Sequence, residues 1–437
     1  MEPWLVGVVA LIILLVLLML GMPVAYTFAV AGFLGLWWIT GLNSALATLK
    51  GVAYYQVANY SWSVFPLFIV MGVVAGESGL TGDAFGAAEK WLDKVRGGLA
   101  FATTVAGTLF AAVCGSTLAA SVTMAQVAWP EMRKAKYNHA LSLGSILCAG
   151  SLAALIPPSI GFVVYAMLAD ESVGRLFIGG IIPGIVLAVM MIITVQIWIM
   201  IDPKAAPAST KVPWSEKFKV LRGTWTILLL IILVMGGLWG GIFTANEAAG
   251  VGAFGTMAIA MMKKRLTWKG TLRVFADAAG MSANIFLLLV CVQIFNNLLT
   301  VTNLPTMLAN WVVSMHLSAT MVLIVILFVY AILGVPLEFP PILMLTLPIF
   351  VPVLVGLGID KVWFGILSTI TVGLAGITPP VGGPMFLVHG VVKKDGVSLN
   401  TVFNGCWVFC IPTIVTLIVC LIWPQLTLWL PGTMFGK

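Results

Sequence analysis

Charged side chains are scarce in this chain. Asp, Glu, Lys and Arg make up 8% of its 437 residues, whereas 61% are hydrophobic and the mean hydropathy is +1.11. Soluble domains carry about 25% charged residues. A chain with so few charges cannot present a polar surface to water, so soluble classes are excluded and a lipid bilayer is the expected surrounding.

Clusters of reactive or metal-binding side chains are missing as well. The three histidines, His139, His316 and His389, stand far apart, and the six cysteines lie in apolar stretches without a C-x-x-C pair. An intramembrane enzyme would need a constellation such as H-E-x-x-H or a nucleophile beside a base, so an enzyme is not favoured. The net charge of +7 comes from short basic clusters between apolar runs, so nucleic acid is not an expected partner.

Long apolar runs dominate what is present. A helix needs roughly 20 residues to cross a bilayer, and runs near this length recur from end to end. The first begins at Trp4 without the basic start and cleavage site of a signal peptide, so we expect a retained transmembrane helix. We predict an all-α polytopic membrane protein with about ten transmembrane helices. The predicted spans are 4–20, 22–40, 62–82, 138–168, 176–200, 224–243, 246–262, 277–300, 362–390 and 398–424.

Two further apolar segments have the features of re-entrant helical hairpins. Segment 97–132 is too long for one ordinary span, is bounded by basic residues at both ends, and carries the turn signal Cys-Gly-Ser-Thr at 114–117. Segment 319–357 is interrupted between Gly334 and Pro341. Each segment is predicted to enter the membrane, turn, and return to the side from which it came.

The basic residues orient the chain. With ten spans and two hairpins, both termini fall outside, and 18 of the 22 Lys and Arg residues fall in cytoplasmic loops. This distribution is what the positive-inside rule requires. The re-entrant tips favour a secondary transporter over a channel or a structural scaffold, because a scaffold has no need of backbone polar groups at mid-membrane.

Paired prolines divide the chain into two similar halves. Pro157-Pro158 and Pro379-Pro380 each interrupt a long apolar span after a hairpin, and the two breaks are 222 residues apart. Each half contains five full crossings, an odd number, so the second half is expected to be inverted relative to the first. We predict a first inverted repeat at 1–201, a cytoplasmic linker at 202–223 and a second inverted repeat at 224–437.

Broken helices place backbone polar groups inside the membrane, where they are tolerated only if they line a cavity or bind a ligand. Carbonyls at the ends of half-helices suit a small hard cation such as Na⁺, and free N–H groups at their starts suit a carboxylate. Ser116 and Thr117 follow the first tip and can cap its second limb or donate to an anion. Glu338 lies at the second tip, where an acidic residue is costly and is therefore a candidate functional residue.

Four motifs together resemble the large membrane subunit of tripartite ATP-independent periplasmic (TRAP) transporters, over nearly the whole chain. They lie at 110–117, 155–160, 241–249 and 376–382. The resemblance implies an elevator-type importer in the bacterial inner membrane, driven by Na⁺ and carrying a small organic acid such as a C4-dicarboxylate or sialic acid. It also implies a small membrane subunit and a periplasmic substrate-binding protein as partners, with both termini of this chain in the periplasm.

The resemblance and the helix-end argument together assign two Na⁺ sites and one substrate site. The first Na⁺ site is expected at Gly115, Ser116, Ile156 and Pro157. The second is expected at Gly334, Glu338, Ile377, Thr378 and Pro379. The substrate is expected between the two tips, near Ser116, Thr117, Ser159 and Gly382.

Two positions depart from the family pattern. The family usually has Asp where this chain has Glu338, and often Pro-Thr where Ala245 and Asn246 precede Glu247. The longer side chain of Glu338 and the extra prolines beside it are expected to change the shape of the second tip. They therefore affect the expected geometry of the second ion site and the expected substrate class. The alternative function is an ion-coupled carboxylate transporter of another inverted-repeat family that works without a binding protein.

Overall fold

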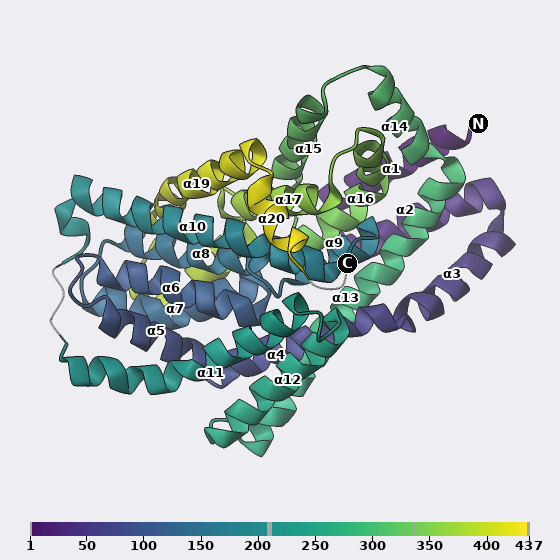
Figure 1. The fold of residues 1–437 in the computed structure, drawn as a ribbon. Helices are drawn as coiled ribbons and strands as arrows, with labels where there is room; N and C mark the ends of the chain where they lie inside the picture. The colour runs from purple at the N-terminus through teal and green to yellow at the C-terminus, as the bar shows by residue number, and fades with distance from the viewer. Residues whose placement is uncertain (1, 208–211, 336, 435–437) are drawn as a thin grey trace.

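The structure, a computed structural model, describes residues 2–207, 212–335 and 337–434. Every regular element within these ranges is a helix, which confirms the all-α class (Figure 1). Six helices are at least 18 residues long and apolar enough to cross a membrane, and five shorter apolar helices accompany them in the described ranges. Pro336 of the second tip, positions 208–211 of the proposed linker and the last three residues lie outside the described residues.

The helices of the two halves follow one another in the same order. The first half contains α1 (Pro3–Met19), α2 (Val24–Thr40), α3 (Leu42–Val57), α4 (Val64–Glu77), α5 (Leu80–Trp91), α6 (Gly98–Cys114), α7 (Thr117–Lys134), α8 (His139–Leu155), α9 (Ile160–Ala169) and α10 (Val173–Ile201). The second contains α11 (Trp214–Trp239), α12 (Ala245–Met262), α13 (Trp268–Thr302), α14 (Leu304–Ser314), α15 (Ala319–Leu333), α16 (Phe339–Gly356), α17 (Lys361–Ile377), α18 (Gly383–Val392), α19 (Leu399–Ile422) and α20 (Gln425–Gly432). Short 3₁₀ turns lie at Tyr60–Ser63, Pro203–Ala205 and Lys393–Asp395.

Both predicted hairpins and both broken spans are present as pairs of helices. The hairpins are α6 with α7 and α15 with α16, and the broken spans are α8 with α9 and α17 with α18. The helices α7 and α16 begin 222 residues apart, at Thr117 and Phe339, and α8 and α17 have the same offset, beginning at His139 and Lys361. Both Pro-Pro peptide bonds are cis. The helix α11 begins at Trp214, inside the segment assigned to the linker, and the proposed repeat boundaries stay a prediction.

Four described helices were not among the predicted spans and hairpins. They are α3, α5, α14 and α20, of 16, 12, 11 and 8 residues. The helix α5 carries Asp83, Glu89 and Lys90, so its mean hydropathy gives no membrane signal. The helix α3 has one buried residue, Ala45. These helices are too short or too polar for a search based on apolar runs to detect.

The helices pack as two groups, with α5 and α14 between them (Figure 1). In one group α13 packs against α2, α3 and α4, and α12 packs against α4 and α11. In the other, α8 packs against α6, α7, α17 and α19. The backbones of α8 and α19 approach closely at Gly144 and Gly405, where a Cβ on Gly405 would lie 2.2 Å from the Ala140 carbonyl oxygen. Small residues permit such contacts between membrane helices.

Polar contacts gather several of the basic loops at one end of the molecule. The Arg96 guanidinium donates to the carbonyls of Pro203 and Ala206, and Asn138 N–H donates to the Ala205 carbonyl. A second set of contacts joins the segments 169–175 and 359–361, where the Lys361 ammonium donates to the carbonyls of Ala169 and Asp170. The basic residues named here thus belong to two separate sets of contacts, and the side of the membrane that each set faces stays a prediction.

The helix α5 is fixed at both ends to the α11–α12 pair. Near its start, Asp83 accepts hydrogen bonds from Lys263 at 2.9 Å and from two nitrogens of Arg265 at 2.8 and 2.9 Å. Just after its end, Asp93 forms an ion pair with Lys217 of α11, and both side chains are at most 4% exposed. The helix that leads into the first hairpin is thus attached to the group that contains α11 and α12.

Candidate functional site

The tip of the first hairpin lies on the break of the first broken span. The Gly115 carbonyl accepts a hydrogen bond from the Ile160 N–H at 3.2 Å. A Cβ on Gly115 would lie 2.7 Å from the Pro158 carbonyl oxygen, and Gly115 has φ +67°, a left-handed conformation suited to glycine. Gly115, Ser116, Ile156 and Pro157, the residues of the first predicted Na⁺ site, therefore belong to one local junction.

The second tip lies beside the second broken span. A Cβ on Gly334 would lie 2.6 Å from the Ala375 Cβ, which is on α17 three residues before Thr378. The Thr378 hydroxyl donates to the Leu374 carbonyl at 2.7 Å and lies 3.6 Å from the Cys410 sulfur. Ile377 and Thr378 end α17, so the predicted second site contains the end of one half-helix and the turn of the second hairpin.

The two halves exchange partners at these junctions. The helix α9 packs against α16, and α18 packs against α7. A Cβ on Gly161 of α9 would lie 2.1 Å from the Phe339 ring, and one on Gly383 of α18 would lie 3.4 Å from the Leu118 side chain. Each half-helix that follows a Pro-Pro break therefore begins beside the second limb of the hairpin from the other half.

Four helix N-termini consequently lie around one central region, which we call the central site. They are the starts of α7, α9, α16 and α18, preceded by Ser116, Ser159, Glu338 and Gly382. The first N–H groups of a helix have no partner within the helix and carry a partial positive charge. The central site thus combines helix starts, which bind carboxylates, with the C-terminal ends of α6, α8, α15 and α17, which carry a partial negative charge.

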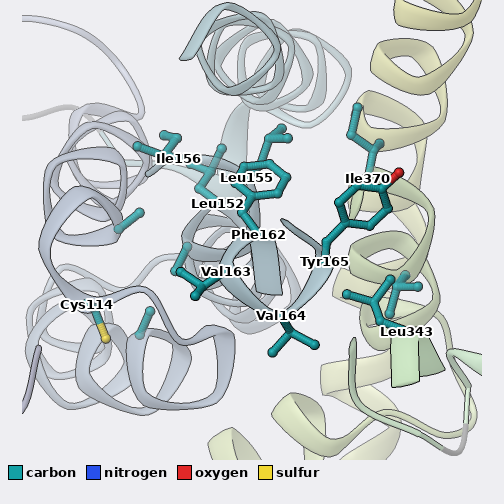
Figure 2. Close-up of a cluster of buried hydrophobic side chains, with 14 of the residues drawn as sticks. Cys114, Leu152, Leu155, Ile156, Phe162, Val163, Val164, Tyr165, Leu343 and Ile370 are labelled. Atoms are coloured by element: carbon teal, nitrogen blue, oxygen red, sulfur yellow. The ribbon is translucent and has the colours of Figure 1, made fainter. Parts of the chain in front are cut away.

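Apolar side chains surround the junction between the tip of the first hairpin and the first Pro-Pro break (Figure 2). Leu152, Leu155 and Ile156 on one side of the break and Phe162 and Val163 on the other are all at most 8% exposed. Figure 2 shows them between Cys114 of the first hairpin and Ile370 of α17. Such a shell excludes water and strengthens the electrostatic interactions of polar groups inside it.

Two hydroxyl groups near this junction have no hydrogen-bond partner in the described part of the chain. They are the Oγ atoms of Ser159 and Ser121, both on buried residues. A buried hydroxyl without a partner is destabilising, so these atoms are available to a ligand. Ser159 was predicted at the substrate site. Ser121 was missed, because a serine within an apolar helix gives no sequence signal that separates it from one bonded to its own backbone.

Ser116 and Glu338 differ in how they begin their helices. The Ser116 hydroxyl accepts a hydrogen bond from the Ala119 N–H at 3.4 Å, so it caps α7 as predicted. Glu338 holds the equivalent position before α16, but its side chain makes no capping bond and is exposed. No hydrogen bond or ion pair within the described ranges joins Glu338 to Thr378. Among the described residues, no three or more His, Cys, Asp or Glu side chains lie together in a way that could hold a metal ion.

The motif around Glu247 lies away from the central site. Thr244 and Glu247 form a capping box at the start of α12, with the Glu247 carboxylate accepting from the Thr244 N–H at 2.8 Å. The Asn246 amide donates to the Tyr60 carbonyl at 2.9 Å and to the Ser63 hydroxyl at 2.8 Å. This motif therefore fixes the start of α12 against the turn before α4.

Comparison with known proteins gives consistent matches along the chain. The sequence model of a family described as "Tripartite ATP-independent periplasmic transporter, DctM component" matches residues 11–426. The C4-dicarboxylate TRAP transporter large permease protein DctM of Vibrio cholerae is 30% identical over 98% of each chain. The sialic acid TRAP transporter large permease protein SiaM of the same organism is 28% identical, over 96% of this chain and 97% of that protein. A crystal structure of the Alcanivorax borkumensis YdaH transporter has a similar fold, with a TM-score of 0.68 and 16% identity over 97% of this chain and 98% of that one.

Proposed function

Because the chain belongs to the DctM family of tripartite ATP-independent periplasmic transporters, and is thus a multi-pass membrane transporter rather than an enzyme, we propose that it imports a small organic acid driven by Na⁺. The observation that carries the proposal is the convergence of four helix N-termini and four helix C-termini at the central site. Helix starts stabilise a carboxylate and helix ends stabilise a cation. A co-transport site for an anion with Na⁺ needs both.

The substrate carboxylate is proposed to lie near Ser116, Thr117, Ser159 and Gly382. The buried Ser159 hydroxyl has no hydrogen-bond partner among the described residues, so it can donate to an anion. The relatives named above carry C4-dicarboxylates and sialic acid, which are both carboxylates. We therefore propose a carboxylate-bearing substrate.

The coupling ions are proposed to bind where half-helices end. The first Na⁺ would be held by oxygens of the Gly115, Ser116, Ile156 and Pro157 junction, and the second by those of Gly334, Ile377, Thr378 and Pro379 with Glu338. Carbonyl and hydroxyl oxygens are suitable ligands for a hard cation, and the C-terminal ends of half-helices carry a partial negative charge that stabilises it.

An elevator movement is supported by the arrangement of the two helix groups. The group with α11–α13 is the proposed fixed frame, and the group with both hairpins is the proposed moving body. The attachment of α5 to α11 and α12 through Asp83 and Asp93 makes α5 part of the frame. The movement would then occur beyond Asp93, at the turn that contains Gly97 with φ +87°.

The proposed function is tested by uptake into proteoliposomes that contain this chain with its small membrane subunit and are supplied with the loaded binding protein. We expect the initial rate to fall at least about fivefold when external Na⁺ is replaced by K⁺, since the ion gradient supplies the driving force. Equal rates in Na⁺ and K⁺ would contradict Na⁺ coupling. Concentrative uptake by this chain alone would contradict the requirement for the two partners.

Glu338 provides a sharper test of the second ion site. Glu338→Gln keeps the size of the side chain and removes its charge, so we expect the Na⁺ concentration for half-maximal uptake to rise about threefold to tenfold. Glu338→Ala should raise it at least as much, and the maximal accumulation ratio should fall if one coupled ion is lost. If Glu338 only touches water at the rim, both variants will keep the wild-type Na⁺ dependence and thermal stability.

A further inference from the structure

A concavity with several charged side chains, which we call the basic cavity, lies between the end of α7 and the segment that follows α18. Its volume is about 500 Å³. Its charged lining residues are Arg133, Lys134, Lys394 and Asp395, with Gln126 and Trp129 beside them. Three cationic side chains and one anionic side chain line the cavity, and Lys134 is also paired with Glu131 at 2.7 Å, so Arg133 and Lys394 outweigh Asp395 in the remaining charge.

The two helices that border the basic cavity also border the central site. The helices α7 and α18 pack against each other, and Leu118 of α7 meets Gly383 of α18 near their starts. At their other ends, α7 stops at Lys134 and α18 at Val392, where the cavity begins. The ten residues of α18 span about 15 Å. This is about half the thickness of a bilayer hydrocarbon core, so the cavity lies at a membrane surface if the central site lies near the middle.

The donors of a carboxylate site are already assembled in the basic cavity. The Asp395 carboxylate accepts a hydrogen bond from the Trp129 indole N–H at 2.8 Å and one from the Arg133 guanidinium at 2.6 Å. An arginine beside a second N–H donor is a common arrangement for binding carboxylates. Asp395 is on the 3₁₀ turn after α18. Its carboxylate therefore occupies donors that could equally bind the carboxylate of a substrate.

We propose that the basic cavity is an exit site that receives the substrate carboxylate from the central site on the cytoplasmic side, with Asp395 as the resident carboxylate that it displaces. The proposal rests on the proposed import of an organic acid. Lys394 is exposed at the cavity and attracts the departing anion, while Arg133 and Trp129 bind it. Asp395 then re-forms its bonds with Arg133 and Trp129 and releases the acid, so the site does not retain its ligand.

The test uses labelling of a cysteine placed in the cavity, which does not depend on transport. All six native cysteines are buried, so Gln126→Cys should be the main reactive thiol. Inside-out vesicles containing the whole transporter are treated with a charged maleimide in the presence of increasing succinate, a C4-dicarboxylate. We expect succinate to protect the cysteine, and NaCl of equal ionic strength to protect it much less.

Variants of the cavity should move this protection in opposite directions. Asp395→Asn removes the competing carboxylate and should lower the succinate concentration for half-protection about tenfold. Arg133→Gln should abolish protection, and Trp129→Phe should weaken it while keeping the ring. Lys393→Gln, a neighbouring exposed lysine outside the lining, is the matched control and should change nothing.

The outcomes separate this inference from the proposed function. Equal protection by NaCl and succinate, or unchanged protection in Arg133→Gln, would overturn the exit site. Protection that appears only in vesicles containing phosphatidylglycerol would also overturn it, and would identify a lipid phosphate as the ligand. Failure of Na⁺-driven uptake alongside intact succinate protection would instead refute the proposed function and leave a carboxylate site of another purpose.

Discussion

Gly115→Ala is expected to lower the initial rate of substrate uptake about twentyfold or more, because the new Cβ meets the backbone at the first tip. It would lie 2.7 Å from the Pro158 carbonyl oxygen, and a backbone atom in a Pro-Pro break cannot move aside as the end of a long side chain can. Alanine at φ +67° is strained in addition. The tip and the break must then separate, which dismantles the proposed first Na⁺ site. Initial rates in proteoliposomes at a fixed Na⁺ gradient measure the effect.

Gly373→Ala is the control for this substitution. Gly373 lies within α17, and a Cβ there would meet no atom within 4 Å in the described part of the chain. The control should retain at least about half of the wild-type rate, since alanine is favourable in a helix. Wild-type transport by Gly115→Ala would show that contact between the first tip and the first break is unnecessary.

Lys217→Met is expected to give the largest loss of stability. Lys217 and Asp93 are 4% and 3% exposed as side chains, and the substitution leaves the Asp93 carboxylate buried without its cationic partner. Breaking a buried ion pair from one side is far more damaging than replacing the pair as a whole. The midpoint of thermal unfolding of the purified protein in detergent should fall on the order of 5–10 °C.

Two comparisons make this prediction specific. The double variant Asp93→Leu, Lys217→Met should unfold at a higher temperature than Lys217→Met alone, because no buried charge remains. Lys90→Met breaks the exposed pair with Glu216 on the same α5–α11 contact and should change the midpoint by less than about 1 °C. An equal loss in Lys90→Met and Lys217→Met would contradict the role of burial.

The pH dependence of the buried pair follows from the pKa of Asp93. A hydrogen bond from Lys217, and then one from the Val212 N–H, lower this pKa below its ordinary value of 3.8. A lowered pKa means that the stabilisation is fully present above the unfolded-state pKa and is lost as the pH falls through the folded-state pKa. The stability difference between wild type and the double variant Asp93→Leu, Lys217→Met, which has no titrating group at this position, should therefore stay constant between about pH 5 and pH 8.

The membrane-spanning elements could be predicted from the sequence because lipid imposes a strong and local rule. An apolar run must form a helix, and a turn signal such as Cys-Gly-Ser-Thr at 114–117 or the Pro-Pro at 379–380 must interrupt it. Both hairpins and both breaks were located within a few residues for this reason. The four short helices could not be predicted from apolar runs. For α3 and α5, for example, the helix depends on packing against α13 and α11 rather than on a long apolar sequence.

The candidate site was only partly accessible from the sequence. Proline and glycine identified where the tips and breaks lie, since those residues interrupt helices wherever they occur. Which break would lie beside which hairpin limb could not be derived, because the contact of Phe339 with Gly161 joins residues 178 positions apart. The pairing of Asp395 with Trp129 and Arg133 was inaccessible for the same reason, and Arg133, which the sequence placed in a loop after the first hairpin, lies in the last turn of α7.

The exchange of partners between α9 and α16, and between α18 and α7, makes the central site an interface within one polypeptide. A protein with only one half would possess a tip and a break, yet the helix starting at its break would have an open flank. In this protein the second limb of the other half's hairpin covers that flank. A protein with only one half could obtain such a limb only from a second copy. Within one polypeptide the two sides of this interface can differ in chemistry, and they do, since Ser116 precedes α7 where Glu338 precedes α16.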